Sequence, residues 1–406
     1  MNSPSLRSGW KMVKFGDIAQ NVAVRVDPAD AKTDVYVGLE HLDPRTLHLR
    51  WWGHPSDVTG QKLVFKNGDV IFGRRRAYQR KLAAAEFDGI CSAHAMVVRA
   101  KPKMVLPEFL PFFLQSDMFM ERAIEISVGS LSPTINWKTL RVQEFPLPPL
   151  DEQKRIAEIL WAANEAAEAY ESVLLSIEQT IDVYRDKSFL LHEARKKKPN
   201  IPSGWRIGFL NEIARIDPSM PKGLPDELEV SFVPMESVNE GGGISKFEIK
   251  KLGEVRKGYT YFEENDVLFA KITPCMENGK GAIAESLKNN IAMGSTEYYV
   301  FRAINPEDTQ FLYHLTMSGI FRKSAERWMQ GSAGHRRVPK DFFTRRPIVI
   351  PDFESRREIG LALDSLQSQK TKIRSHIDAI RTSAFVFLNK SLSQTGDSPC
   401  LTKKAL

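Results

Sequence analysis

Residues 156–191 read IAEILWAANEAAEAYESVLLSIEQTIDVYRDKSFLL, and this stretch decides the fold. A mean repeat of 3.5 residues is typical of a coiled-coil seam. No Gly or Pro interrupts the pattern, which predicts one helix from Asp151 to Glu193, about 60 Å long at 1.5 Å per residue. A helix of that length needs a partner along its seam. The predicted seam consists of Ile156, Leu160, Ala163, Ala167, Tyr170, Leu174, Ile177, Ile181, Tyr184, Ser188 and Leu191.

The partner is predicted in the same chain, because a second seam follows 203 positions later. A capping-box pattern, Ser355-x-x-Glu358, stands before it and predicts the start of a second long helix. Most positions are apolar in both copies, so the two helices are expected to pair with each other. The second seam consists of Ile359, Leu363, Leu366, Lys370, Ile373, Ile377, Ile380, Ala384, Phe387 and Ser391.

The blocks before the two helices also resemble each other. Ser203-Gly204-Trp205 repeats Ser8-Gly9-Trp10, and Asp266–Phe269 repeats Asp69–Phe72. We therefore predict an α+β fold of two tandem α/β domains separated by two long helices, which form an antiparallel coiled coil with the two halves in pseudo-twofold relation. The predicted boundaries are 1–150 for the first domain, 151–198 for the first helix and linker, 199–351 for the second domain, 352–392 for the second helix, and 393–406 for a loose tail.

Alternation and turn residues predict the elements of the first block. Strands are expected at Val35–Leu42, Lys62–Phe65, Asp69–Arg74 and Ser92–Arg99. Apolar residues at helical spacing after Pro107 predict a helix to Ser127. Pro146–Pro149 is expected to be extended, because proline cannot continue a helix and restricts the residue before it.

Composition places the chain among ordinary globular proteins. It has 406 residues, 42% of them hydrophobic and 26% charged, and no apolar run of 18 residues that would predict a membrane span. Met1–Gly9 lacks the apolar core of a signal peptide, and Cys91, Cys275 and Cys400 lie far apart, so we expect reduced thiols and a cytoplasmic location. The net charge of +7 is compatible with nucleic-acid binding but does not establish it.

Two pairs of corresponding loops are the candidate recognition surfaces. In the first block a basic run, Arg74–Lys81, follows the strand Asp69–Phe72. Its arginines could pair with phosphate or guanine; a solvated basic loop is the alternative. A hydroxyl-rich loop at Gly129–Asn136 is the second candidate, with a flexible connector as its alternative. The candidate DNA-binding residues of this block are Arg74, Arg75, Arg76, Tyr78, Gln79, Arg80, Lys81, Ser130, Ser132, Thr134 and Asn136.

The second block repeats both loops with different side chains. Its run at 271–280 is less basic, and its loop at 331–337 is rich in small and basic residues, so the two blocks are expected to recognise different base sequences. The candidate DNA-binding residues here are Lys271, Thr273, Asn278, Lys280, Ser332, His335, Arg336 and Arg337.

No catalytic motif is recognisable in the sequence. Gly279-Lys280 lacks the upstream glycine of a phosphate loop, and there is no Gly-x-Ser-x-Gly elbow and no Asp/Asn-Pro-Pro-aromatic run of an amino-methyltransferase. His41, His48 and His54 match no usual ligand spacing, which favours ordinary polar histidines over a metal site. The sequence therefore predicts a non-catalytic protein that binds no metal.

Residues 145–160, FPLPPLDEQKRIAEIL, resemble the proline-rich entry, Glu-Gln motif and first helical spacer of the specificity subunits of type I restriction–modification enzymes. Residues 266–280, DVLFAKITPCMENGK, with Gly294–Glu297 after them, resemble a target-recognition domain of that family. The resemblance extends to about Leu392. The second spacer departs from the motif, since Phe353–Arg356 replaces Glu-Gln, and different contacts are expected there.

The resemblance implies a non-catalytic subunit whose two domains each recognise one half of a bipartite, asymmetric site in double-stranded DNA. It implies docking of two methyltransferase (modification) subunits, with a possible motor-nuclease (restriction) subunit. No cofactor is expected on this chain; S-adenosylmethionine is expected on the methyltransferase. The helices would act as a ruler between the half-sites. Two alternatives stay open: a specificity subunit of a methylation-only or type IIB-like system, and a structural protein–protein adaptor without DNA contact.

Overall fold

The computed structural model describes residues 6–130, 132–332 and 334–393. The predicted tail beyond position 393, with Cys400, lies outside the described residues. The chain divides into two compact units. Unit 1 holds the residues up to Ser172 together with those from Arg374 onward, and unit 2 holds Val173–Ile373. Each of the two long helices therefore contributes residues to both units.

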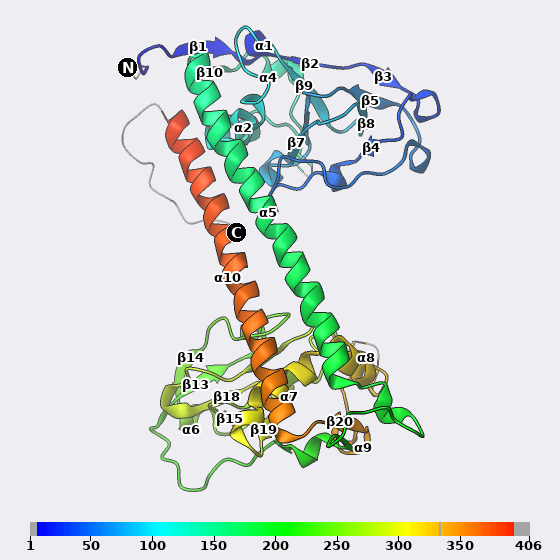
Figure 1. The fold of residues 1–406 in the computed structure, drawn as a ribbon. Coiled ribbons are helices and arrows are strands. Elements are labelled where there is room, and N and C mark those ends of the chain that lie inside the picture. Colours follow the sequence, from blue (N-terminus) through cyan, green and yellow to red (C-terminus); the bar gives the residue numbers. More distant parts are fainter. Residues whose placement is uncertain (1–5, 131, 333, 394–406) are drawn as a thin grey trace. The chain divides into compact units, whose positions relative to one another are not determined.

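The two long helices are α5 (Leu150–Phe189) and α10 (Phe353–Leu392), each of 40 residues (Figure 1). The expected extension of the first helix to Glu193 is wrong. Leu190 takes a left-handed conformation with φ of +44°, which ends the helix and leaves the predicted seam residue Leu191 in the following turn.

The expected capping box of the second helix is also wrong. α10 begins two residues before Ser355, and the Asp352 carboxylate accepts hydrogen bonds of 2.9 Å from both the backbone N–H and the hydroxyl of Ser355. These bonds hold the pKa of Asp352 below its usual value. Asp352, and not Ser355, is thus the side chain that accepts a free backbone N–H of the first turn.

Within unit 1, the helices run antiparallel. Leu160 and Leu388 lie in one apolar cluster, and further along α5 the Tyr170 ring lies 5.8 Å from the His376 ring. The residue number thus rises along one helix while it falls along the other. An ion pair of 2.7 Å from Arg381 to Glu171 adds to this contact.

Unit 2 contains the same antiparallel arrangement. Ile181 and Leu363 belong to one apolar cluster, and Lys370, which replaces an apolar residue of the seam, donates to Glu178 at 2.8 Å. Along both helices the predicted seam side chains are buried or half-buried except Tyr170, which is 38% exposed. Each fully buried Leu or Ile contributes about 1.5–3 kcal/mol to stability. This packing stabilises the two long helices, because helices in proteins owe most of their stability to the burial of an apolar face.

The globular part of unit 1 contains three small sheets. Their strand orders are β2-β9-β6-β7, β3-β5-β8-β4 and β1-β10. The strands are β1 (Lys11–Lys14), β2 (Ala19–Asn21), β3 (Arg25–Val26), β4 (Tyr36–Val37), β5 (Lys62–Phe65), β6 (Val70–Phe72), β7 (Leu82–Ala84), β8 (Gly89–Cys91), β9 (Met96–Ala100) and β10 (Glu144–Leu147), and the helices are α1 (Phe15–Ile18), α2 (Leu110–Gln115), α3 (Asp117–Glu125) and α4 (Trp137–Leu140).

Unit 2 repeats this plan with orders β12-β19-β16-β17, β14-β13-β18-β15 and β11-β20. One edge differs, because β14 pairs with β13, whereas β3 pairs with β5 at the opposite edge of its sheet. The strands are β11 (Arg206–Gly208), β12 (Ala214–Ile216), β13 (Glu229–Val233), β14 (Glu248–Lys251), β15 (Thr260–Glu263), β16 (Val267–Ala270), β17 (Gly281–Ile283), β18 (Ile291–Gly294), β19 (Tyr298–Ala303) and β20 (Ile348–Ile350), and the helices are α6 (Leu252–Val255), α7 (Thr309–Met317), α8 (Gly319–Glu326) and α9 (Asp341–Arg345).

An ion pair between a buried aspartate and a half-buried arginine occurs at the same place in both units. Arg99 donates from Nε and Nη2 to the two carboxylate oxygens of Asp69 at 2.6 and 2.8 Å. Arg302 does the same to Asp266 at 2.8 and 2.7 Å. Both carboxylates also accept the backbone N–H of the residue three positions earlier, so the same turn enters the same strand in each unit.

Several predicted elements of the first block are shorter than expected. The strand expected from Val35 is only β4, followed by a 3-10 turn, and the strand expected from Ser92 begins at Met96. The predicted helix to Ser127 is broken at Ser116, whose hydroxyl caps α3 by accepting the N–H of Phe119. In each case a polar side chain bonds the local backbone and competes with the regular element.

Candidate nucleic-acid interface

The two candidate loops of unit 1 lie against each other. After β6, Arg75 forms an isolated β-bridge with Thr134 of the hydroxyl-rich loop. Backbone bonds on both sides fix this bridge: the N–H of Arg76 donates to Pro133 at 2.9 Å, and that of Ile135 to Arg74 at 3.0 Å. The basic run and the hydroxyl-rich loop, separated by more than fifty residues, thus form one surface.

Four side chains of the basic run are exposed on this surface: Arg75, Arg76, Tyr78 and Gln79. Neither Arg75 nor Arg76 makes an ion pair within the part of the chain that the structure describes. Arg76 and Arg80 both take left-handed φ values, of +55° and +50°, around the single 3-10 turn between them. Such backbone is costly for a side chain with a Cβ and is a feature of functional loops.

The other three basic residues of the run are anchored inside unit 1. Arg74 donates to the Ala93 carbonyl at 3.0 Å, and burial lowers its pKa. Arg80 donates to the Gln115 carbonyl and to Asp117, and Lys81 donates to the Leu39 carbonyl at 3.1 Å. These contacts hold the loop in place and make Arg80 and Lys81 weaker candidates for DNA contact than Arg75.

Sequence reasoning missed two residues that lie beside the positive patch. His94 is exposed, and its pKa is lowered by burial and by the positive charges of Arg75, Arg74 and Lys62. Arg25 lies near enough to Arg74 to lower the pKa of that guanidinium as well. The positive charges of Arg25, Arg74 and Arg75 lie close together, and among the described residues none of the three forms an ion pair with a carboxylate. This is the electrostatic pattern of a polyanion-binding surface.

The hydroxyl-rich loop supplies neutral groups to the same surface. Ser130 and Asn136 are exposed, and Ser132 and Thr134 are half-buried. The Thr134 hydroxyl donates to the Ser132 carbonyl at 3.0 Å, which stiffens the loop. Gly129 has a φ of +117°, close to the +121° of Gly331 in unit 2, so the two loops turn in the same way.

Unit 2 brings its two candidate loops together by the same backbone bonds. Ile272 bridges to Arg337, the N–H of Thr273 donates to Arg336 at 3.0 Å, and that of Val338 donates to Lys271 at 2.9 Å. These bonds correspond one by one to those of unit 1.

The side chains at the unit 2 interface are more fully paired. Lys271 lies over the Tyr299 ring at 5.0 Å, Thr273 donates to Glu277, and Asn278 donates to Glu240. Arg336 donates to the Glu326 carbonyl, while Ser332 and His335 are exposed.

Two further basic residues of the unit 2 interface are also bound by protein groups. Lys280 donates to the Met235 carbonyl just as Lys81 of unit 1 donates to the Leu39 carbonyl, so both lysines are structural anchors. Arg337 forms a two-pronged ion pair with Glu297, and this pair raises the pKa of Arg337.

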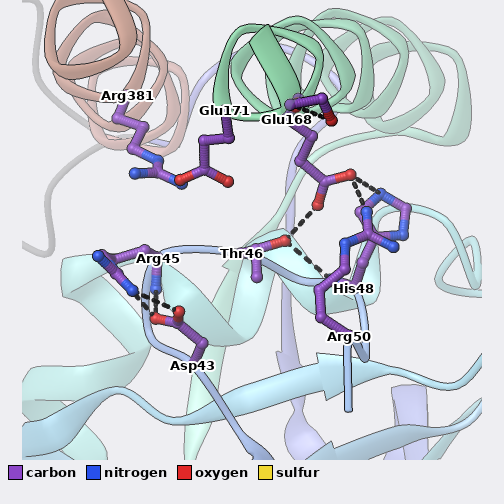
Figure 2. A network of polar contacts seen from close by, with 9 residues as sticks. Asp43, Arg45, Thr46, His48, Arg50, Glu168, Glu171 and Arg381 are labelled. Atoms are coloured by element: carbon purple, nitrogen blue, oxygen red, sulfur yellow. Dashed lines mark hydrogen bonds and ion pairs between the residues drawn. The ribbon is translucent and has the colours of Figure 1, made fainter. Parts of the chain in front are cut away.

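A polar network connects the globular part of unit 1 to α5 (Figure 2). Glu168 on the helix accepts from the Thr46 hydroxyl at 2.6 Å and pairs with Arg50. His48 lies beside this carboxylate and contacts Glu86, and its ring lies 5.2 Å from that of Trp161. The long segment before β5 is therefore fixed to α5 by a hydrogen bond and ion pairs.

No metal or membrane site is visible in the part of the chain that the structure describes. Over residues 6–393, apart from positions 131 and 333, no group of three His, Cys, Asp or Glu side chains is arranged to hold a metal ion. His41, His48 and His54 bind other protein groups instead. In the same described ranges no helix has the length and apolar content needed to cross a membrane.

Comparisons with known proteins agree with the duplicated architecture. The family model for the type I restriction modification DNA specificity domain matches residues 7–169 and 202–380. A crystal structure of the S subunit of a type I restriction–modification system from M. genitalium has the same fold, with a TM-score of 0.59 at 14% identity over 97% of this chain and 98% of the other.

Two curated relatives from Escherichia coli are similar over part of their length. The EcoEI specificity subunit is 39% identical over 204 residues, which are 48% of this chain and 34% of the relative. The EcoAI specificity subunit is 40% identical over 178 residues, which are 43% of this chain and 30% of the relative. The chain thus spans about a third of the length of these curated relatives.

Proposed function

Because the chain belongs to the type I restriction modification DNA specificity family, we propose that it recognises a bipartite DNA sequence, with one half-site bound by each unit. The observation that carries this proposal is the paired-loop interface, which the two units build with the same backbone bonds. Phosphate contacts position a protein on DNA, while side chains that reach base edges give specificity. Each interface has basic and hydroxyl side chains suited to both tasks.

The differences between the interfaces support an asymmetric site. Unit 1 exposes Arg75 and Arg76, neither of which pairs with a carboxylate among the residues that the structure describes. The arginine of unit 2 that is most exposed at the interface, Arg337, is paired with Glu297. Different donor patterns select different base pairs in the major groove. The two half-sites are therefore proposed to have unrelated sequences.

The partners proposed for this chain are double-stranded DNA and two methyltransferase subunits, with motor-nuclease subunits in a complex that also cleaves. S-adenosylmethionine would be bound by the methyltransferase, and this chain would hold no cofactor and perform no chemistry. Its contribution would be to place the methyltransferases at a chosen sequence. A methylation-only or type IIB-like system would use the same chain in the same way.

The test is to purify the complex through a tagged copy of this chain and select bound duplexes from a randomised DNA library. We expect enrichment of one bipartite sequence and a binding constant that falls steeply with salt, because phosphate contacts release counterions. Methylation mapping in cells with and without the chain should identify the same sequence. Assembly with partners but no sequence preference would instead favour a structural adaptor.

A further inference from the structure

A turn beside each interface holds a side chain that the sequence analysis did not name as a DNA-binding candidate. The hydroxyl of Ser92 accepts the N–H of His94 at 3.2 Å, and that of Ser295 accepts the N–H of Glu297 at the same distance. His94 and Glu297 therefore occupy equivalent positions. The bridge next to the turn also changes, from Arg75–Thr134 in unit 1 to Ile272–Arg337 in unit 2, so the bridge arginine comes from the opposite loop.

The Glu297–Arg337 pair is fixed but still accessible. Arg337 donates from Nε to Oε2 at 2.9 Å and from Nη2 to Oε1 at 2.6 Å, and its Nη1 donates to the His335 carbonyl at 3.1 Å. The Arg337 side chain is 46% exposed and that of Glu297 is 24% exposed. A guanidinium has five N–H groups. Among the described residues three of them have acceptors, which leaves one N–H on each Nη nitrogen for a ligand.

We propose that Glu297 positions Arg337 to recognise a guanine in the half-site bound by unit 2; this rests on the proposed function. Two parallel donors match the O6 and N7 acceptors that guanine presents in the major groove. A guanidinium ordered before binding loses less conformational entropy when DNA arrives. The Glu297 carboxylate also repels nearby phosphate, so the pair suits a base edge rather than the DNA backbone.

Unit 1 lacks this arrangement. At the position of Glu297 it has His94, whose neighbours Arg74 and Arg75 are also basic. Within residues 6–393, positions 131 and 333 excepted, Arg75 thus pairs with no carboxylate that would fix its rotamer or keep it from phosphate. The same turn and bridge give an oriented arginine in one unit and a freer, more positive surface in the other.

The proposal is tested with complexes purified through the full chain and selected on duplexes randomised in the half-site of unit 2. Arg337→Ala should lower the preference for guanine at one position by about 5- to 150-fold, with the half-site of unit 1 unchanged. Glu297→Gln should weaken the preference at that same position by a smaller factor. Arg337→Lys should not restore it, because lysine lacks the planar fork.

Arg345→Ala is the matched control, since Arg345 is an exposed arginine of unit 2 with a carboxylate partner, Asp341, in the same short helix α9. It should leave every base preference intact. A uniform loss of affinity for all sequences in Arg337→Ala would make Arg337 a phosphate contact and overturn the proposal. Absence of any sequence preference in the unaltered complex would instead overturn the proposed function itself.

Discussion

Arg75 is the residue whose exposure most directly predicts contact with DNA. It lies on the bridge that joins the two loops of unit 1 and has no ion-pair partner in the described part of the chain. Arg75→Ala should weaken binding to the first half-site by about 1–3 kcal/mol if it contacts a base, and the preference at the second half-site should persist. Lys103→Ala, which removes an exposed charge outside both loops, is the control. Equal loss on all sequences would assign Arg75 to phosphate only.

The sequence identified the loops but not which side chains in them are free. The basic run looks uniform in the sequence, yet Arg80 and Lys81 are used to anchor the loop while Arg75 is exposed. His94 and Glu297 were not among the candidate contacts, because neither is in a charged run. Glu297 ends the quoted Gly294–Glu297 motif, but only the turn and the bridge bring it and His94 to the interface. Such proximity depends on pairing between loops more than fifty residues apart, which local patterns do not encode.

A buried histidine gives unit 2 a predicted pH dependence. His314 on α7 lies four residues before the capping Ser318, as Phe112 lies four before Ser116. Burial and the neighbouring Arg185, whose Nη2 is 3.2 Å from Nδ1, lower the pKa of His314 to about 3. In the unfolded chain histidine takes up a proton below about pH 6.5, so acidification favours unfolding.

Between pH 7 and pH 5 this linkage should reduce the free energy of unfolding by about 2 kcal/mol. His314→Phe, which copies the residue of unit 1, should remove that part of the acid sensitivity. The measurement is thermal unfolding of both proteins across this pH range. Identical pH slopes for the two proteins would show that His314 is not the group responsible.

At the scale of elements, one side chain fixes the start of each long helix; it is buried in α5 and partly buried in α10. Gln153 donates to the Pro148 carbonyl at 2.8 Å and also accepts the N–H of Leu106 at 2.9 Å. At the corresponding place in α10, Arg356 donates to the Pro351 carbonyl at 2.8 Å. The departure of the second spacer from the Glu-Gln motif thus keeps the contact to the proline carbonyl but introduces a charge.

Asp308 balances that charge. Its side chain is 3% exposed and accepts from Arg356 at 2.8 and 3.0 Å. Asp308→Ala should cost about 3–5 kcal/mol of stability in unit 2, because it leaves a buried guanidinium unpaired. Glu354→Ala, which breaks an exposed pair with Arg357 on the same helix, should change stability by less than about 0.5 kcal/mol. Urea unfolding of both variants tests this, and equal small effects would refute the role given to Asp308.

The periodic elements were the most predictable part of the fold. The 3.5-residue repeat located both helices to within a few residues, because a seam of apolar side chains must face a partner along its whole length. The short strands were less predictable, since β4 and β9 are bounded by turns in which Ser, Thr or His side chains bond the backbone. Those bonds compete with strand pairing, and the pattern of apolar residues in the sequence does not predict them.

At the scale of the whole molecule, the two long helices belong to both units, so their length is proposed to set the distance between the DNA half-sites. Removing seven residues from the middle of α5 and seven from the facing part of α10 would preserve the seam register, because seven is the coiled-coil repeat. Each helix would shorten by about 10 Å, which corresponds to about three base pairs at 3.4 Å per pair. We expect the nonspecific spacer in the methylated sequence to become about three base pairs shorter while both half-sites stay the same.

A deletion in α5 alone is the control, since it puts the seams out of register and should destabilise the chain without producing a new site. If methylation mapping finds the original spacer after the matched deletions, the length of the helices does not set the distance between the half-sites.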